Sequence, residues 1–276
     1  MYTTIIDVPT LQANLGRPDW LVIDCRFSLA DTAAGERAYA AAHIPGAVYA
    51  HLDRDLSSEP VTDSGRHPLP APDAINTALQ RLGVNPDSQV IVYDDAGGMV
   101  AGRLWWMLGY MGHEAVAVLS GGWQGWLAAG GETRSGVESV PAGTFNGTPD
   151  PSRFIQMDEV PQAKLLIDSR AMPRYLGEME HLDPIAGHIP GARNFHFERN
   201  LADKYFRPAA ELREQFVALL GDTDPADAVF YCGSGVSACV NLVALKYAGL
   251  GDAKLYVGSW SEWGRAGDQP IATGPE

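Results

Sequence analysis

The cysteine at position 232 stands where a nucleophile could be activated. The residues before it read AVFY, a short apolar run typical of a buried parallel strand. The residues after the turn, VSACVNLVALKYAGL, carry apolar side chains at helical spacing. The connection is Cys232-Gly233-Ser234-Gly235. This pattern predicts a cysteine at the carboxyl end of a strand, facing the amino end of a helix.

That position favours the ionised form of Cys232. Unpaired N–H groups at a helix start stabilise an anion, so the pKa of the thiol should lie below the value of about 8.5 for a free cysteine. Gly233 and Gly235 allow the backbone to turn its N–H groups inward as an anion-binding nest. Val236 and Ser237 follow as further candidate binding residues, and Ser237 could donate to the thiolate, with an ordinary helix residue as the alternative. Such a nest would hold a thiolate or a persulfide equally well. The alternative is a buried cysteine beside a glycine turn.

Four segments of the chain occur twice in the same order. They are LVIDCRF and LLIDSRA (21–27 and 165–171), AAHIPGAV and AGHIPGAR (41–48 and 186–193), VIVYDDAGG and AVFYCGSG (90–98 and 228–235), and LSGGWQGWLAAG and YVGSWSEWGRAG (119–130 and 256–267). The offsets are 168 − 24 = 144, 188 − 43 = 145, 231 − 93 = 138 and 260 − 123 = 137. Ordered matches with drifting offsets indicate a duplicated domain.

The duplication predicts two domains joined by a linker. Residues 131–152 are rich in Gly, Pro, Ser and Thr and lack apolar periodicity, so we expect a first domain over 1–130, a linker over 131–152 and a second domain over 153–276. Short apolar runs alternate with amphipathic segments such as 73–82 and 209–220, and Gly221 follows the second as a C-cap. Each domain is therefore predicted to be α/β with a central parallel sheet, which binds ligands beyond the carboxyl ends of its strands.

Composition and charge exclude several classes of function. The 276 residues, 46% of them hydrophobic, can build two ordinary domains. A net charge of −14 argues against a nucleic-acid partner, and an anionic substrate would need a local group of arginines. No apolar stretch approaches the roughly 20 residues that cross a bilayer, and no secretory signal is visible, so we expect a cytoplasmic protein without a membrane partner.

The cysteine pattern adds a further exclusion. Three cysteines without a C-x-x-C spacing predict neither a disulfide framework nor a structural metal site, and at least one free thiol. Cys239 follows Cys232 by two helical turns, about 10 Å along a helix axis, which is too far for a disulfide. We expect Cys25 and Cys239 to be core residues. Asp24 and Asp168 are expected to be structural.

The tandem D-x-R, H-I-P-G-A and G-G/S-W-x-x-W segments resemble the rhodanese superfamily over essentially the whole chain. The resemblance implies two tandem rhodanese-like three-layer α/β/α domains, each with a five-stranded parallel sheet, and a sulfurtransferase site in the cleft between them. The CGSGV loop is more similar to that of 3-mercaptopyruvate sulfurtransferases than to the CRKGV loop of thiosulfate sulfurtransferases. The first copy has Asp94 where the second has Cys232, so the first domain is expected to be inactive and the second catalytic.

The resemblance also assigns supporting residues. In the family, the arginine that matches Arg174 binds the anionic donor, with a solvated surface arginine as the alternative here. Arg170 either contributes to donor binding or forms a structural salt bridge. A second binding arginine usually precedes the second H-I-P-G, but this chain has His181 near that place and no arginine.

Proton transfer could involve two further side chains. Ser234 matches a loop serine that can donate a hydrogen bond to the leaving group or help to move a proton. A relay histidine has been assigned in relatives to the first H-I-P-G segment, here His43. Because a histidine occupies this place in both copies, as His43 and His188, a shared structural role in a turn is the favoured alternative.

The expected reaction moves a sulfane sulfur from a small anionic donor, with 3-mercaptopyruvate favoured, to cyanide or a thiol through a Cys232 persulfide. A thioredoxin-like protein is a possible acceptor, and no cofactor is expected. Thiosulfate as the donor and a persulfide carrier or binding module without turnover are the alternatives. A phosphatase of the same fold is disfavoured, because its Cys-x5-Arg loop would need an arginine where this chain has Ala238.

Overall fold

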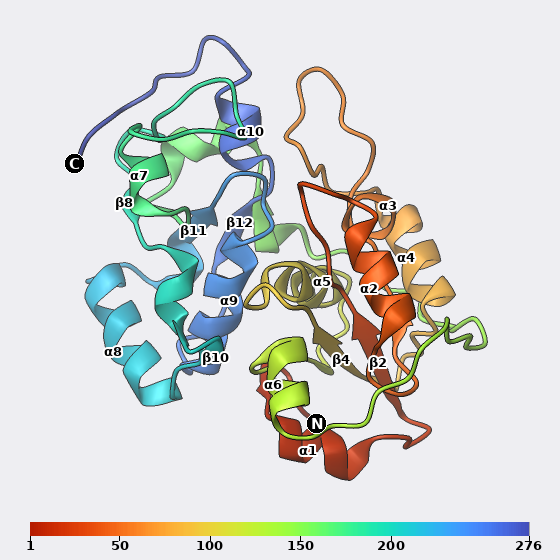
Figure 1. Ribbon diagram of the computed structural model, residues 1–276. Helices are drawn as coiled ribbons and strands as arrows, with labels where there is room; N and C mark the ends of the chain where they lie inside the picture. The colour runs from red at the N-terminus through yellow and green to blue at the C-terminus, as the bar shows by residue number, and fades with distance from the viewer. Residues whose placement is uncertain (276) are drawn as a thin grey trace. The chain divides into compact units, whose positions relative to one another are not determined.

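The computed structural model describes residues 1–275 and divides into two compact units (Figure 1). The first unit comprises 1–58, 70–150 and 203–206, and the second comprises 59–69, 151–202 and 207 onward. Each unit thus contains one copy of the repeat and one short segment from the other half of the chain.

The first unit contains a five-stranded parallel sheet in the order β1-β5-β4-β2-β3. Its strands are β1 (Ile5–Ile6), β2 (Trp20–Asp24), β3 (Val48–Tyr49), β4 (Gln89–Tyr93) and β5 (Val116–Leu119), and the short strand β10 (Tyr205–Phe206) also belongs to this unit. In the register of the central pair, Trp20 lies opposite Gln89 and Asp24 lies opposite Tyr93. Every residue of β4 is buried, as the continuous apolar run predicts for a strand covered on both faces.

Helices cover both faces of this sheet. They are α1 (Val8–Asn14), α2 (Ala34–Ala41), α3 (Leu52–Asp55), α4 (Pro72–Arg81), α5 (Met99–Tyr110) and α6 (Gly122–Ala128). Helix α5 packs on β4 and β5. Leu11 of α1 and Trp126 of α6 share one core cluster with alternating strand residues such as Ile91 and Tyr93. The unit is therefore a three-layer α/β/α domain.

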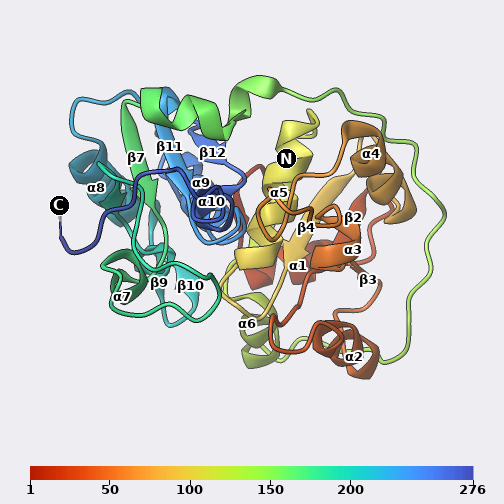
Figure 2. The ribbon, with the colours of Figure 1, turned by 90° about the horizontal axis from the view of Figure 1, so that it is seen from above.

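The second unit repeats this plan with the strand order β6-β12-β11-β7-β8, all parallel. Its strands are β6 (Phe154–Ile155), β7 (Leu165–Asp168), β8 (Arg193–Asn194), β11 (Ala228–Tyr231) and β12 (Lys254–Tyr256), with the short strand β9 (Leu201–Ala202) outside the sheet. Its helices are α7 (Met172–Tyr175), α8 (Ala209–Leu220), α9 (Ala238–Tyr247) and α10 (Ser259–Trp263), and its 3-10 helices are η1 (Pro151–Arg153), η2 (Met157–Gln162), η3 (Phe197–Asn200) and η4 (Pro225–Asp227). Figure 2 shows β7, β11 and β12 side by side.

The predicted fold class and helices are confirmed. The helix expected over 209–220 spans Ala209–Leu220, and Gly221 follows it with φ of 59°. The helix expected over 73–82 spans Pro72–Arg81. No helix within residues 1–275 combines the length and the apolar character that a membrane span requires.

Two segments differ from the expected domain division. Residues 131–150, predicted to be a linker, belong to the first unit, where Gly143 N–H donates to the carbonyl of Gln80 and Phe145 N–H donates to that of Val84. These backbone bonds anchor a stretch that has little apolar periodicity. Residues 59–69, predicted to be part of the first domain, belong to the second unit.

Candidate active site

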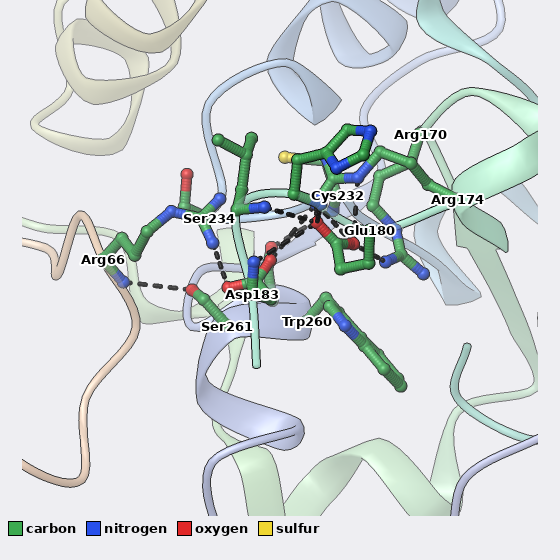
Figure 3. A network of polar contacts seen from close by, with 12 residues as sticks. Arg66, Arg170, Arg174, Glu180, Asp183, Cys232, Ser234, Trp260 and Ser261 are labelled. Atoms are coloured by element: carbon green, nitrogen blue, oxygen red, sulfur yellow. Dashed lines mark hydrogen bonds and ion pairs between the residues drawn. The ribbon is translucent and has the colours of Figure 1, made fainter. Parts of the chain in front are cut away.

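Cys232 lies in the tight turn between β11 and α9 (Figure 3). Gly235 adopts a φ of 72°, and a Cβ there would lie 2.4 Å from the carbonyl oxygen of Val257. Only glycine fits at this point, so the sequence Gly233-Ser234-Gly235 makes the turn tight enough to aim its N–H groups at the cysteine. The predicted position of Cys232 at a strand end and a helix start is confirmed.

The surroundings of Cys232 lower the pKa of its thiol. Burial is the largest influence and raises the pKa, since the side chain is 2% exposed. The Ser237 hydroxyl and the N–H groups of Ser234, Val236 and Ala238 stabilise the thiolate by hydrogen bonding, and together they outweigh burial. The net pKa lies below its ordinary value, which agrees with the prediction of an activated thiolate.

The matching loop of the first unit surrounds a buried carboxylate, and burial raises the pKa of Asp94 above its ordinary value even though the loop donates to it. Its Asp94 carboxylate, which replaces the cysteine, accepts hydrogen bonds from four backbone N–H groups at 2.8–3.0 Å, those of Ala96, Gly98, Val100 and Ala101. Three of them correspond to the donors around Cys232, because 232 − 94, 234 − 96, 236 − 98 and 238 − 100 all equal 138. The duplicated loop is therefore an anion nest in both copies, filled by a carboxylate in one and by a thiol in the other.

A strained serine braces the Cys232 turn from α10. The Cys232 N–H donates to the Ser259 hydroxyl at 3.2 Å, and that hydroxyl donates to the carbonyl of Tyr256 at 2.9 Å. Ser259 has a φ of 55°, which is unfavourable for a residue with a Cβ. Its counterpart in the first copy is Gly122, with φ of 52°. The copy that carries the cysteine thus has a strained side chain that bonds to the backbone of Cys232.

Arg170 is a brace in the second unit. Its guanidinium donates to Asp168 at 2.5–3.0 Å and to the Gly187 carbonyl at 2.7 Å, is 1% exposed, and lies over the Trp260 ring at 4.7 Å. Arg26 makes the same contacts with Asp24 in the copy without a cysteine. Of the two interpretations of Arg170, the structural salt bridge is the one that the structure shows, and Asp24 and Asp168 have the structural role expected of them.

Arg174 and Arg66 lie next to the loop that carries Cys232. A Cβ placed on Gly233 would lie 2.8 Å from Nη2 of Arg66 and 3.4 Å from Nη1 of Arg174. The Arg174 side chain also donates to Glu180 at 2.8–3.0 Å. Arg174 is 20% exposed and partnered, so the solvated surface alternative does not apply to it. Arg66 was not among the predicted site residues.

The structure places His67 beside Ser234. Its Nδ1 lies 2.7 Å from the Ser234 hydroxyl, and both residues are buried. His43 instead has Nδ1 2.8 Å from the carbonyl of Tyr39 and stacks on that ring. His188 makes the matching contact with its own tyrosine, Tyr175, at 2.7 Å. Of the two interpretations of His43, the shared turn role is the one that the structure shows, and His67 is the histidine that lies next to Ser234.

The other two cysteines lie in the core. Cys25 is fully buried, and burial followed by the charge of Asp24 raises the pKa of its thiol well above the ordinary value. Cys239 is buried and donates to the Gly235 carbonyl at 3.5 Å. Both are core residues, as predicted. Within residues 1–275, no three His, Cys, Asp or Glu side chains are grouped so as to hold a metal ion.

Comparison with known proteins agrees with this geometry. The rhodanese-like domain family matches residues 7–129 and 150–266. A Pseudomonas aeruginosa protein described as a probable 3-mercaptopyruvate sulfurtransferase is 46% identical over 280 residues, which cover 98% of each chain. The 3-mercaptopyruvate sulfurtransferase of Escherichia coli K12 is 33% identical over 278 residues, again 98% of each. The solved structure of 3-mercaptopyruvate sulfurtransferase from Leishmania major has a TM-score of 0.89 and 32% identity, and the match covers 98% of this chain and 76% of that one.

The chain therefore belongs to the rhodanese family, and it is a sulfurtransferase.

Proposed function

We propose that the protein transfers sulfur from 3-mercaptopyruvate to cyanide or a thiol through a persulfide on Cys232. One observation carries the proposal: a buried cysteine whose pKa is lowered by converging N–H and O–H donors. A thiolate is the nucleophile, and the same donors suit the negative charge of a persulfide.

In the first half-reaction, the Cys232 thiolate attacks the donor sulfur. A new S–S bond forms and the C–S bond of 3-mercaptopyruvate breaks, so the electron pair passes to the carbon as the enolate of pyruvate. The enolate takes up one proton to become pyruvate, and the donor's own thiol supplies one proton. The net step therefore moves a proton from sulfur to carbon.

Ser234 and His67 are the residues suited to move that proton. The hydroxyl and the imidazole Nδ1 are 2.7 Å apart, close enough for the serine to give a proton to the enolate and be reprotonated through the ring. Thiosulfate would need no such transfer, because sulfite leaves as an anion. A proton-carrying pair beside Cys232 therefore supports 3-mercaptopyruvate over thiosulfate as the donor, as do the names of the relatives.

In the second half-reaction, cyanide or an acceptor thiolate attacks the outer sulfur. The S–S bond breaks and its electron pair returns to the Cys232 thiolate, which the same nest stabilises.

A thiol or thioredoxin-like protein is our proposed acceptor in the cell, and the cytoplasm is our proposed compartment. Free thiols at Cys25, Cys232 and Cys239 suit such a reducing environment.

Intact-mass measurement tests this function. Incubation with 3-mercaptopyruvate should add one sulfur, map to Cys232, and disappear on addition of cyanide as thiocyanate accumulates over many cycles. Cys232→Ser should show neither the adduct nor turnover. An adduct that is absent, or that maps to Cys25 or Cys239, would contradict the proposal. So would a single stoichiometric burst of thiocyanate without turnover.

A further inference from the structure

Two guanidiniums face the backbone beside Cys232, and one carboxylate joins them. The Asp183 side chain bonds through Oδ1 to Nη1 of Arg66 and through Oδ2 to Nη2 of Arg174 at 3.2 Å (Figure 3). The Asp183 side chain is 2% exposed, whereas the side chains of Arg66 and Arg174 are 17% and 20% exposed. The carboxylate of a donor would need to bind across the same two guanidiniums in this way.

Charge balance indicates that Asp183 and a donor compete for this position. Arg170 is neutralised by Asp168 and Arg174 by Glu180, which leaves Asp183 as the counter-ion of Arg66. A second carboxylate could not share the two guanidiniums with Asp183 without strong repulsion between like charges in a partly buried site. Binding of an anionic donor therefore requires Asp183 to move away.

The movement falls to the Asp183 side chain. Residues 178–187 form neither helix nor strand, but the N–H groups of His181, Leu182 and Asp183 donate to the Glu180 carboxylate and the Ile185 carbonyl accepts from Trp260, so the backbone is held while the Asp183 carboxylate turns away. Arg66 is anchored through its backbone N–H, which donates to the Ser261 hydroxyl at 3.0 Å. Its buried Nε has no hydrogen-bond partner, so the guanidinium keeps a donor that the present contacts leave unused.

We propose that Arg66 and Arg174 together bind the carboxylate of the donor, and that Asp183 occupies this site until the donor displaces it. The inference rests on the proposed function. The stretch before His188 contains no second binding arginine. Arg66, in residues 59–69, would supply that second guanidinium instead.

Donor kinetics and pyruvate inhibition test this assignment in the full chain. Arg66→Met should raise the KM for 3-mercaptopyruvate and the inhibition constant of pyruvate, a carboxylate without sulfur, by roughly 10- to 100-fold. The rate at which preformed persulfide reacts with cyanide should not change, since that step does not use the donor site. Asp183→Asn should lower both constants several-fold, because it removes the competing charge.

A matched control separates donor binding from anchoring of the segment. Arg265 also contacts residues 59–69, through a bond to the Ser64 carbonyl at 3.4 Å, but it is exposed. Arg265→Ala should therefore leave both constants unchanged. If Arg66→Met behaves like this control, Arg66 does not bind the donor. If Asp183→Asn raises the constants instead, Asp183 braces the arginines and is not displaced.

The failure of this inference can be told apart from the failure of the proposed function. If the wild-type protein forms no Cys232 adduct, the proposed function is wrong. If the adduct forms and donor affinity ignores both Arg66 and Asp183, only the assignment of the donor site is wrong.

Discussion

Nδ1 of His67 lies 2.7 Å from the hydroxyl oxygen of Ser234, although 167 residues separate the two in the sequence. Proton transfer by this pair is useful only when the leaving group must be protonated on carbon. 3-Mercaptopyruvate leaves as an enolate that must be protonated, whereas thiosulfate leaves as sulfite. Comparing the two donors therefore tests whether the Ser234–His67 pair transfers a proton.

His67→Gln and Ser234→Ala should each lower kcat/KM for 3-mercaptopyruvate by roughly 100-fold, the usual contribution of a positioned acid–base group. With thiosulfate, both variants should retain most of the wild-type activity, because sulfite needs no proton. The measurement is thiocyanate formation with each donor at fixed cyanide. His196→Gln, at a partly exposed histidine of the same unit and outside residues 178–187, is the control. Equal losses with both donors would show that the pair only supports the shape of the loop.

The pH at which Cys232 reacts should depend on Ser237. The wild-type pKa is lowered because hydroxyl and N–H donors to the thiolate outweigh burial, so the rate of alkylation by iodoacetamide should rise with pH around a midpoint below that of an ordinary cysteine thiol. Ser237→Ala removes one donor while burial remains. The pKa therefore rises, and the rate profile moves to higher pH.

Alkylation of the Cys232→Ser protein gives the background for this measurement, since Cys25 and Cys239 remain in it and are buried. A profile that does not move in Ser237→Ala would mean that the backbone N–H groups alone hold the thiolate.

The Asp94 nest should be important for stability. In Asp94→Asn, an amide NH2 replaces one carboxylate oxygen and faces two N–H groups that then lack an acceptor, at a cost of roughly 2–5 kcal/mol in the free energy of unfolding. Urea denaturation measures the change. Asp95→Asn, the same substitution at the next and less buried residue, should cost clearly less. Equal effects of the two variants would show that the nest contributes little.

The sequence predicts the site where the chemistry is local. The strand, the turn and the helix around Cys232 are contiguous, so apolar patterning and two glycines suffice to place the thiol and its donors. The repeat adds the contrast with Asp94 and correctly suggests a shared structural role for His43 and His188.

Arg66 and His67 could not be placed in the same way. They lie in an irregular segment whose partners are more than one hundred residues away, and no periodicity reports such contacts. One signal was present: unlike the H-I-P-G histidines, this Arg-His pair has no match in the second copy.

The predicted linker over 131–152 differs from the structure for a related reason. Its contacts are backbone hydrogen bonds, which composition does not reveal.

Ser259 offers a last test, because strain and hydrogen bonding act there in opposite directions. At a φ of 55°, a side chain costs about 1–2 kcal/mol, whereas the hydroxyl accepts the Cys232 N–H and contributes about 1 kcal/mol. Ser259→Gly removes both effects, so its stability should stay close to that of the wild type. Ser259→Ala keeps the strain and leaves the Cys232 N–H without this acceptor, so it should lose about 1–3 kcal/mol.

Ser259→Gly and Ser259→Ala should lose sulfur-transfer activity to a similar extent. Each removes the hydroxyl that holds the Cys232 N–H, and Cys232 is the residue that must point at the donor. Urea denaturation and thiocyanate assays on the two proteins separate these effects. If activity followed stability, with Ser259→Gly fully active, the strained serine would have only a folding role. If activity fell in both while stability fell only in Ser259→Ala, the hydroxyl positions Cys232. The first copy, with Gly122 at a φ of 52° and no cysteine to position, is consistent with that outcome.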